Sequence, residues 1–409
     1  MIDRLTDLRA LTVMLKAAAS SGGEAAGQDL TESALSADAG VTADGPAAKD
    51  AMGSLLPTLS KRPFSSREPD SPAPASVGGP SDPAEAAAPV PAPPPIELLK
   101  QALRVAIRLE FATVPPYLTA LWSIVDQAHP VAKVIRAIAH EEMLHVALLC
   151  NFLSALGERP SLTGNVVPRY PSALPGGVHP ELEIHLLGYS PEALDIFMEI
   201  ERPEEPLSIE GEPIPDFPAE DTTIGEFYAA ILDLFETILP ALDPRHQIVG
   251  PFVWFVLTKP EDVREAIGLI MSQGEGARGQ PFSRDPRFLA HYYRFKSLAL
   301  SVELIWDEAT KTLKKGKPIE QPSVFTLAAA SPLGYTLAAP QPLRDANDRF
   351  EASYSQLLRL LEEAWKDGGH KSYVAALEHM FDLTQFAQSM MRIGTPDGRG
   401  YCPAFIYRP

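Results

Sequence analysis

The sequence predicts an all-α protein built on a four-helix bundle with one long crossover and additional C-terminal helices. From about residue 96, apolar residues recur at the three- and four-residue spacing of amphipathic helices. A long Pro-rich segment separates one pair of such helices from a second pair. No stretch shows the sustained apolar–polar alternation that is typical of a half-buried strand.

The composition is that of a globular protein, with 409 residues of which 45% are hydrophobic. The net charge is −18 and the basic residues form no long run, which argues against nucleic acid or an anionic membrane surface as a partner. Two cysteines, Cys150 and Cys402, are too few for a disulfide framework or a cysteine-ligated metal site.

The sequence also predicts a cytoplasmic protein with no membrane segment. No uninterrupted apolar run reaches the roughly 20 residues that span a bilayer. The N-terminus alternates charged with apolar residues and lacks the apolar core of a signal peptide.

Four regions follow from the change of composition along the chain. Residues 1–19 predict a short amphipathic helix. Residues 20–95 are rich in Ala, Pro, Gly and Ser, so we expect a disordered linker that cannot bury enough apolar surface to fold. Residues 96–315 predict the helical bundle, and residues 316–409 predict a helical extension packed on it.

Within these regions, Pro and Gly residues delimit the predicted helices. Pro130 suits a first helical turn and Gly157 a helix end. Two helix pairs joined by one long crossover have the connectivity of ferritin-type bundles. The predicted helices cover 96–126, 130–156, a short segment opened by Ser190, 222–239, 260 to about 274–279, 286–314, 346–366 and 372–393.

Glu110 lies at the centre of the apolar stripe of the first bundle helix, between Ile107 and Val114. An unpaired buried carboxylate costs several kcal/mol, by order of magnitude, unless a cation or hydrogen bonds compensate. Two readings follow from the residues: Glu110 pairs with an arginine or hydroxyls, or it binds a metal ion.

The second bundle helix carries Glu142 and His145 within its apolar stripe. Their Glu-x-x-His spacing puts a carboxylate and an imidazole on one helical face, where both can bind the same metal or neighbouring metals. Glu141 is either solvated or orients the His145 ring without itself binding the metal. Beside the inward Glu110, this motif predicts a metal site.

Glu226, at the edge of the third stripe, is the predicted ligand from that helix, because small residues beside it leave room for a metal or substrate. A surface glutamate would give the same pattern, and Glu236 or Glu201 are substitutes.

Glu275 continues the apolar face of the fourth helix within a glycine-rich segment. It is either a ligand or a solvated residue at a helix end. No histidine follows it at the third position, so His291, on an apolar face of the next helix, is the predicted replacement. The alternative for His291 is a hydrogen-bonded core histidine.

Five motifs in this order resemble the ferritin-like domain of the iminophenylpyruvate dimer synthase family, which includes the violacein and rebeccamycin pathway enzymes. Those enzymes are much longer, so the chain looks like a stand-alone relative. The resemblance implies Glu110, Glu142, His145, Glu226, Glu275 and His291 as metal ligands, and it keeps haem as an alternative cofactor. The motifs are Leu109–Leu121, His140–Val146, Thr223–Tyr228, Gln273–Gly276 and His291–Phe295, with a weaker one at Gly398–Tyr407.

The predicted cofactors are therefore two metal ions, iron ahead of manganese, and the predicted function is an oxidase or oxygenase that uses O₂ or peroxide. The expected substrate is small and organic, amino-acid-derived or indolic, and a homo-oligomer is compatible with the sequence. Tyr117, Tyr228 and Tyr292 are candidates to line the cofactor cavity, with core packing as the alternative. A metal-storage protein and a helical scaffold with an internally paired polar core are the rival functions.

Overall fold

The protein is described by a computed structural model that places residues 8–25, 93–177, 180–213, 223–274, 276, 279–283, 285–331, 335 and 339–409. The predicted linker lies for the most part outside these described residues. The regular secondary structure of the described part is helical apart from one two-stranded sheet, which confirms the predicted all-α class.

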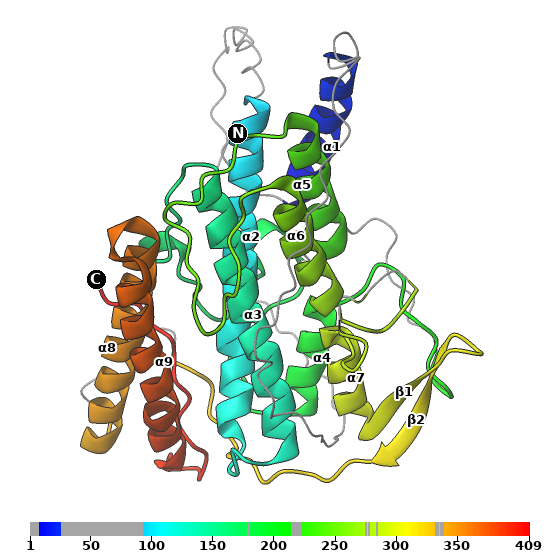
Figure 1. Ribbon diagram of the computed structural model, residues 1–409. Helices are drawn as coiled ribbons and strands as arrows, with labels where there is room; N and C mark the ends of the chain where they lie inside the picture. Colours follow the sequence, from blue (N-terminus) through cyan, green and yellow to red (C-terminus); the bar gives the residue numbers. More distant parts are fainter. Residues whose placement is uncertain are drawn as a thin grey trace, which may run out of the picture.

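A central pair of long helices, α2 (Pro95–Ser123) and α3 (Pro130–Ala155), forms the axis of the molecule (Figure 1). Each helix begins with a proline, whose fixed φ and missing N–H suit a first turn. Almost every side chain of α2 from Leu98 onward is buried, because other elements cover it on several sides. Both helices match the predicted ranges to within a few residues.

Four shorter helices pack on one side of this pair: α4 (Pro191–Ile200), α5 (Ile224–Ile238), α6 (Pro260–Gly274) and α7 (His291–Leu300) (Figure 1). The Ser190 side chain accepts a hydrogen bond from the Ala193 N–H and caps α4. Thr223 and Glu226 form a reciprocal capping box that opens α5. The Ser190 cap fixes where the short helix of the crossover begins, and the Thr223 cap fixes where the second half of the bundle begins.

The predicted helix over 286–314 is wrong beyond Leu300. Ser301 adopts a left-handed conformation with φ 59° and ends α7. The chain then forms an antiparallel hairpin of β1 (Val302–Asp307) and β2 (Thr312–Pro318). The β-branched and aromatic residues Val302, Ile305 and Trp306 favour a strand once the helix has stopped.

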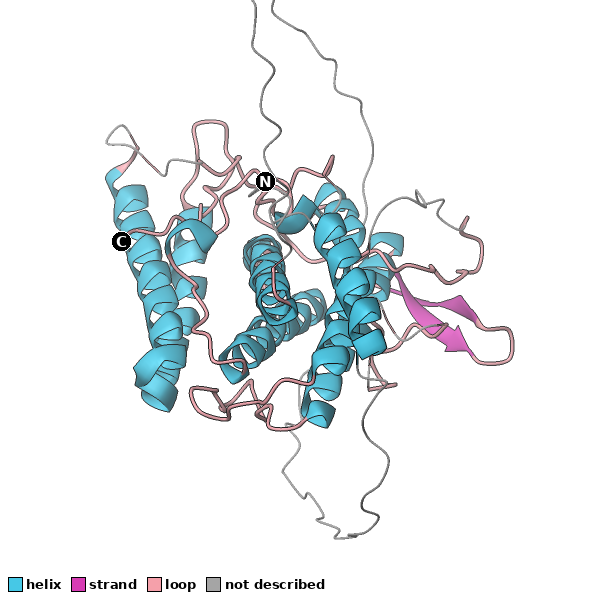
Figure 2. Ribbon diagram, turned by 90° about the horizontal axis from the view of Figure 1, so that it is seen from above, coloured by secondary structure: helices cyan, strands magenta, loops and turns pink. Residues whose placement is uncertain are grey.

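A C-terminal hairpin of α8 (Gln341–Glu363) and α9 (Gly369–Arg392) packs against the other side of α2 and α3 (Figures 1 and 2). A π-helical turn, Ala364–Gly368, joins the two helices. At the N-terminus, α1 (Leu8–Ala25) lies against α5. Across the described residues, no helix is both long and apolar enough to cross a bilayer.

Candidate metal centre

Helices α2 and α3 bring two carboxylates and one imidazole together in the interior. Glu110, Glu142 and His145 are 5%, 2% and 1% exposed, respectively. Nδ1 of His145 lies 3.0 Å from Oε2 of Glu110 and 3.6 Å from Oε1 of Glu142. The three-residue spacing of Glu142 and His145 on α3 places both side chains on the face that meets Glu110.

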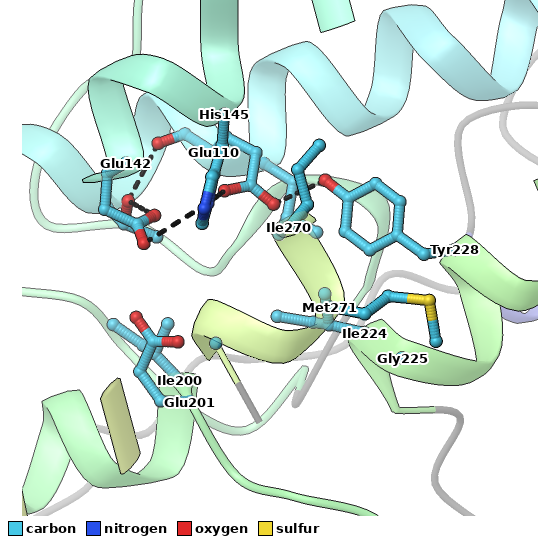
Figure 3. Close-up of a pocket in the computed structure, with 13 residues that line it drawn as sticks. Glu110, Glu142, His145, Ile200, Glu201, Ile224, Gly225, Tyr228, Ile270 and Met271 are labelled. Atoms are coloured by element: carbon cyan, nitrogen blue, oxygen red, sulfur yellow. Dashed lines mark hydrogen bonds and ion pairs between the residues drawn. The ribbon is translucent and has the colours of Figure 1, made fainter. Parts of the chain in front are cut away.

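A second group of side chains meets the first at Glu142. Glu201 lies at the C-cap of α4, and His291 is the first residue of α7. Nδ1 of His291 lies 2.9 Å from Oε1 of Glu142 and 3.4 Å from Oε1 of Glu201. Four elements distant in sequence therefore converge on one buried region. Figure 3 shows Glu201 facing Glu110, Glu142 and His145 across a gap.

The five side chains form two overlapping clusters, Glu110–Glu142–His145 and Glu142–Glu201–His291, and Glu142 belongs to both. Within each cluster the possible ligand atoms lie within 4.8 Å of one another. Carboxylate oxygens and imidazole nitrogens together suit iron, manganese and zinc. These clusters could hold metal ions, and the shared glutamate suits a pair of neighbouring ions.

The outer nitrogen of each histidine is held by a different side chain. Nε2 of His145 lies 2.9 Å from Oε1 of Gln273, and Nε2 of His291 lies 2.8 Å from Oε2 of Glu141. Arg294 donates in turn to Glu141. These oxygens accept an N–H from Nε2 of each ring. Nδ1 of His145 in turn donates to Oε2 of Glu110, because a carboxylate oxygen can only accept. A metal ion in the cluster would replace the proton on Nδ1 and take its lone pair.

Hydroxyl groups form hydrogen bonds with the three carboxylates of the clusters. Tyr117 donates to Oε1 of Glu201 at 2.7 Å, Tyr228 donates to Oε1 of Glu110, and the Thr113 hydroxyl lies 2.6 Å from Oε2 of Glu142. Burial, followed by the charge of nearby glutamates, raises the pKa of both tyrosines well above the usual value. Both phenols therefore stay protonated and remain hydrogen-bond donors near neutral pH.

The electrostatics of the cluster show a surplus of negative charge. Burial, then the charges of Glu201 and Glu110, raises the pKa of Glu142 to about 7. Burial would also raise the pKa of Glu110, but the hydrogen bond and charge of His145 outweigh it, and the pKa falls below its usual value. A cation between the carboxylates would offset the repulsion that raises the pKa of Glu142.

His291 supplies a direct test of whether a metal ion fits. Its Nδ1 is fully buried and lacks a hydrogen-bond partner of acceptable geometry, although two carboxylate oxygens lie near it. A buried polar atom without a partner costs free energy, of the order of 1–3 kcal/mol. A metal ion shared with Glu142 and Glu201 would use this lone pair, so the donor set fits a metal.

The space enclosed at the centre is small. A cavity of about 30 Å³ is bounded by the cluster and by Tyr228, Met271 and Gly225 (Figure 3). One or two ions and a water-sized molecule fit there, whereas an aromatic ring does not. A larger surface hollow of about 350 Å³ lies next to it and shares Gly225 and Met271 as wall residues.

Of the residues predicted from sequence, the structure brings Glu110, Glu142, His145 and His291 together. Glu226 lies outside both clusters, although the sequence favoured it over Glu201 and Glu236 as the ligand. Its carboxylate belongs to the capping box of α5 and lies 3.6 Å from Nζ of Lys16 on α1. Glu201, named as a substitute, occupies the centre instead. Glu275 lies outside the described residues.

Of the other candidate residues, two contact the clusters and two lie away from them. Glu236 pairs with Arg264 at 2.6 Å at the surface. Tyr117 and Tyr228 reach the cluster, but Tyr292 does not, because it packs edge-on to Tyr293 in the small apolar cluster beside the β-hairpin.

Sequence reasoning missed the roles of Thr113 and Gln273, and it linked Glu141 to His145 rather than to His291. Thr113 lies three residues after Glu110 and so on the same face of the helix, a spacing that could have predicted its position in the site. Gln273 lies on α6, and no spacing rule within that helix links it to His145 on α3.

The described residues form a helical bundle whose buried Glu and His side chains make a candidate metal-binding site. Residues 103–300 match the family model described as Ferritin-like. A ferritin-like protein from Caulobacter vibrioides, solved at 1.95 Å resolution, aligns with a TM-score of 0.53 and 22% identity, over 76% of this chain and 97% of that one. Curated proteins give no match.

Proposed function

We propose that the protein is a di-iron oxidoreductase that uses O₂ or peroxide to oxidise a small organic molecule. The observation that supports it best is the position of Glu142, which belongs to two buried carboxylate–histidine clusters at once. Such sharing is the arrangement expected of a bridging ligand between two neighbouring ions. The motif resemblance to the iminophenylpyruvate dimer synthase family supports an amino-acid-derived or indolic substrate.

In this proposal, Glu110 and His145 would hold one ion, Glu201 and His291 would hold the other, and Glu142 would be shared between them. Three carboxylates supply a charge of −3, so two ferrous ions would leave the described ligand set near +1. Four carboxylates were expected from the sequence. The fourth, Glu275, lies outside the described residues, and it would bring the charge to neutrality.

Bound iron would supply the one-electron and oxygen chemistry that side chains lack. The protein's own residues would position and protect that chemistry. Tyr117 and Tyr228 fix the outer ligands Glu201 and Glu110 by hydrogen bonds, while Gln273 and Glu141 fix the two imidazoles. These hydrogen bonds would orient the ligand side chains for a bound ion.

The organic substrate would approach from the surface hollow rather than enter the centre. The cavity at the cluster holds about 30 Å³, whereas the adjoining hollow holds about 350 Å³. Their common wall consists of Gly225 at the start of α5 and Met271 near the end of α6. A substrate in the hollow would therefore lie close to the cluster and still leave room at the ions for an oxygen-sized molecule.

A metal and activity assay on the full chain tests this function. Iron, manganese, zinc and haem are measured after anaerobic reconstitution with Fe²⁺, and O₂ consumption is followed with tryptophan, indole-3-pyruvate and phenylpyruvate. About two iron ions per chain and substrate-dependent O₂ uptake are expected, both lost in Glu142→Ala and kept in Glu226→Ala. No stoichiometric metal in the parent, or metal binding unchanged by Glu142→Ala, would overturn the proposal.

A non-catalytic metal-binding role is the second candidate, because the cavity at the cluster is too small for any organic ring. The same preparations distinguish the two functions. Stoichiometric iron without O₂ uptake for any organic substrate, or uptake of many iron ions per chain, would favour binding or storage over oxidation.

A further inference from the structure

The two overlapping clusters of the candidate metal centre have matching carboxylates. Both clusters share Glu142, and each has one further glutamate of its own. A tyrosine hydroxyl donates to each of these separate glutamates: Tyr228 donates to Glu110. Tyr117 donates to Glu201 at 2.7 Å. We call the two clusters by their histidines, the His145 position (Glu110, Glu142, His145) and the His291 position (Glu142, Glu201, His291).

The two histidines differ in the partner of their outer nitrogen. Nε2 of His145 lies 2.9 Å from the amide oxygen of Gln273, which is a neutral acceptor. Nε2 of His291 lies 2.8 Å from Oε2 of Glu141, a carboxylate that is ion-paired with Arg294. A charged acceptor takes the ring N–H more strongly than an amide does, and it raises the basicity of the nitrogen on the other side of the ring. The ring of His291 is therefore the stronger metal ligand.

Arg294 is buried, with an exposed fraction of 6%, and its Nη2 donates to Oε2 of Glu141. Burying a guanidinium and a carboxylate costs desolvation free energy, which is recovered only with good geometry and further hydrogen bonds. Here the further hydrogen bond comes from the Nε2–H of His291 to the same carboxylate oxygen. The ion pair thus keeps Glu141 ionised and holds it behind the His291 ring.

The inner nitrogens of the two histidines differ as well. Nδ1 of His145 donates to Oε2 of Glu110 at 3.0 Å, so an ion at the His145 position must displace this hydrogen bond. Nδ1 of His291 is buried without a hydrogen bond of acceptable geometry. A buried polar atom without a partner is destabilising, and an ion at the His291 position would give this nitrogen a partner. Both differences favour the His291 position.

We propose that the two metal positions are unequal and that the His291 position binds the first ion. Glu141 and Arg294 are the positioning residues that make the difference, because they place a charged acceptor behind His291 where His145 has a neutral one. This inference deepens the proposed function and rests on it, since it requires that both clusters bind metal.

Single-ion affinities test the inequality without repulsion between two bound ions. His145→Ala leaves only the His291 position intact, and His291→Ala leaves only the His145 position. Co²⁺, which suits carboxylate and imidazole ligands, is titrated into each full-length variant and followed by calorimetry and visible absorption. Each variant should bind one Co²⁺ per chain, and His145→Ala should bind it about 10- to 100-fold more tightly. Glu110→Ala and Glu201→Ala repeat the comparison in the same order if a histidine variant does not fold.

A paired substitution tests the positioning residues. Glu141→Gln combined with Arg294→Met places a neutral amide behind His291 and leaves the net charge unchanged. Added to His145→Ala, this pair should lower the Co²⁺ affinity by about 10- to 100-fold, to near that of His291→Ala. Added to His291→Ala, it should leave the affinity unchanged, because Glu141 bonds the ring that this variant lacks.

The matched control is Glu158→Gln combined with Arg104→Met. It removes an ion pair with an N–O distance of 2.5 Å that lies outside both clusters, so neither single-ion affinity should change. Circular dichroism and thermal melting verify that each variant folds.

Equal single-ion affinities, a tighter site in His291→Ala, or loss of Co²⁺ binding in both single variants would overturn the inequality, even where the parent protein binds two ions. An equal loss of affinity in both backgrounds would overturn the positioning role of Glu141 and Arg294. Absence of stoichiometric Co²⁺ in the parent protein would instead overturn the proposed metal centre, and this inference with it.

Discussion

Nδ1 of His291 lies 2.9 Å from Oε1 of Glu142, so the first residue of α7 reaches a glutamate in the middle of α3. This contact joins the pair of helices before the crossover to the last helix of the bundle. It also turns the Glu-x-x-His motif of α3 into part of a five-residue ligand set. The properties of Glu142 therefore decide how the whole set behaves.

Substitution of Glu142 by alanine should abolish binding at both metal positions. The reason is that Glu142 contributes to both clusters, whereas Glu110 and Glu201 each contribute to one. We expect metal content to fall from about two ions per chain to near zero in Glu142→Ala, and to about one in Glu110→Ala, as in a di-metal site with one shared ligand. Inductively coupled plasma mass spectrometry after dialysis measures this. Equal metal loss in the two variants would contradict the shared role.

Glu201 and Glu226 offer a matched pair of glutamates for a second prediction. Glu201 is buried beside His291, while Glu226 caps α5 and pairs with Lys16. Glu201→Ala should lose one metal ion per chain, whereas Glu226→Ala should keep both and lose about 0.5–2 kcal/mol of stability with its capping interactions. Metal analysis and urea unfolding separate the two effects. Metal loss in Glu226→Ala alone would restore the expectation drawn from the sequence.

The helix stripes and the ligands on α2 and α3 could be predicted because they depend on local periodicity. Glu110 stood out as an acid inside an apolar stripe, and Glu142 with His145 as a pair on one face. Both signals come from residues within one helix, where spacing determines direction. The helix pair itself was predicted within a few residues for the same reason.

Glu201 could not be selected from its sequence alone. It is the C-cap of the short helix α4, beyond the last apolar residue of its face, so no stripe marks its direction. Only the fold carries it beside Tyr117 and His291. The capping role of Glu226 was readable, since Thr223 three residues earlier makes the capping-box pattern.

The outer partner of His145 gives a third prediction. Oε1 of Gln273 accepts from Nε2 of His145, and this contact fixes the ring with Nδ1 toward the carboxylates. Gln273→Leu should weaken metal affinity about 10- to 100-fold without removing a ligand, as is usual for partners of ligating histidines. Competition with a chelator gives the affinity. Ser272→Ala is the control, because its hydroxyl bonds the Leu269 carbonyl outside the site. Equal affinities for the two variants would exclude the orienting role.

Glu362 on α8 gives the last prediction, which concerns stability and pH. Its Oε2 accepts hydrogen bonds from the backbone N–H groups of Leu162 and Thr163 at 2.9 and 3.0 Å and from the Thr163 hydroxyl at 2.7 Å. These contacts tie the C-terminal hairpin to the loop that follows α3. Burial raises the pKa of Glu362, but Lys366 and these donors outweigh it and bring the pKa to about 2.

Because the pKa of Glu362 is lower in the folded protein than the ordinary value of 4.5, its carboxylate stabilises the fold above about pH 4.5. This contribution should be lost as the pH falls from 4.5 toward 2, where the folded protein also takes up the proton. At pH 7, Glu362→Gln should lower the free energy of unfolding by about 1–3 kcal/mol. Urea unfolding from pH 7 to 3 should show the parent and the variant converging at low pH. Glu363→Gln, at the exposed neighbouring position, should match the parent throughout, and a constant difference between parent and Glu362→Gln would show that the charge is not responsible.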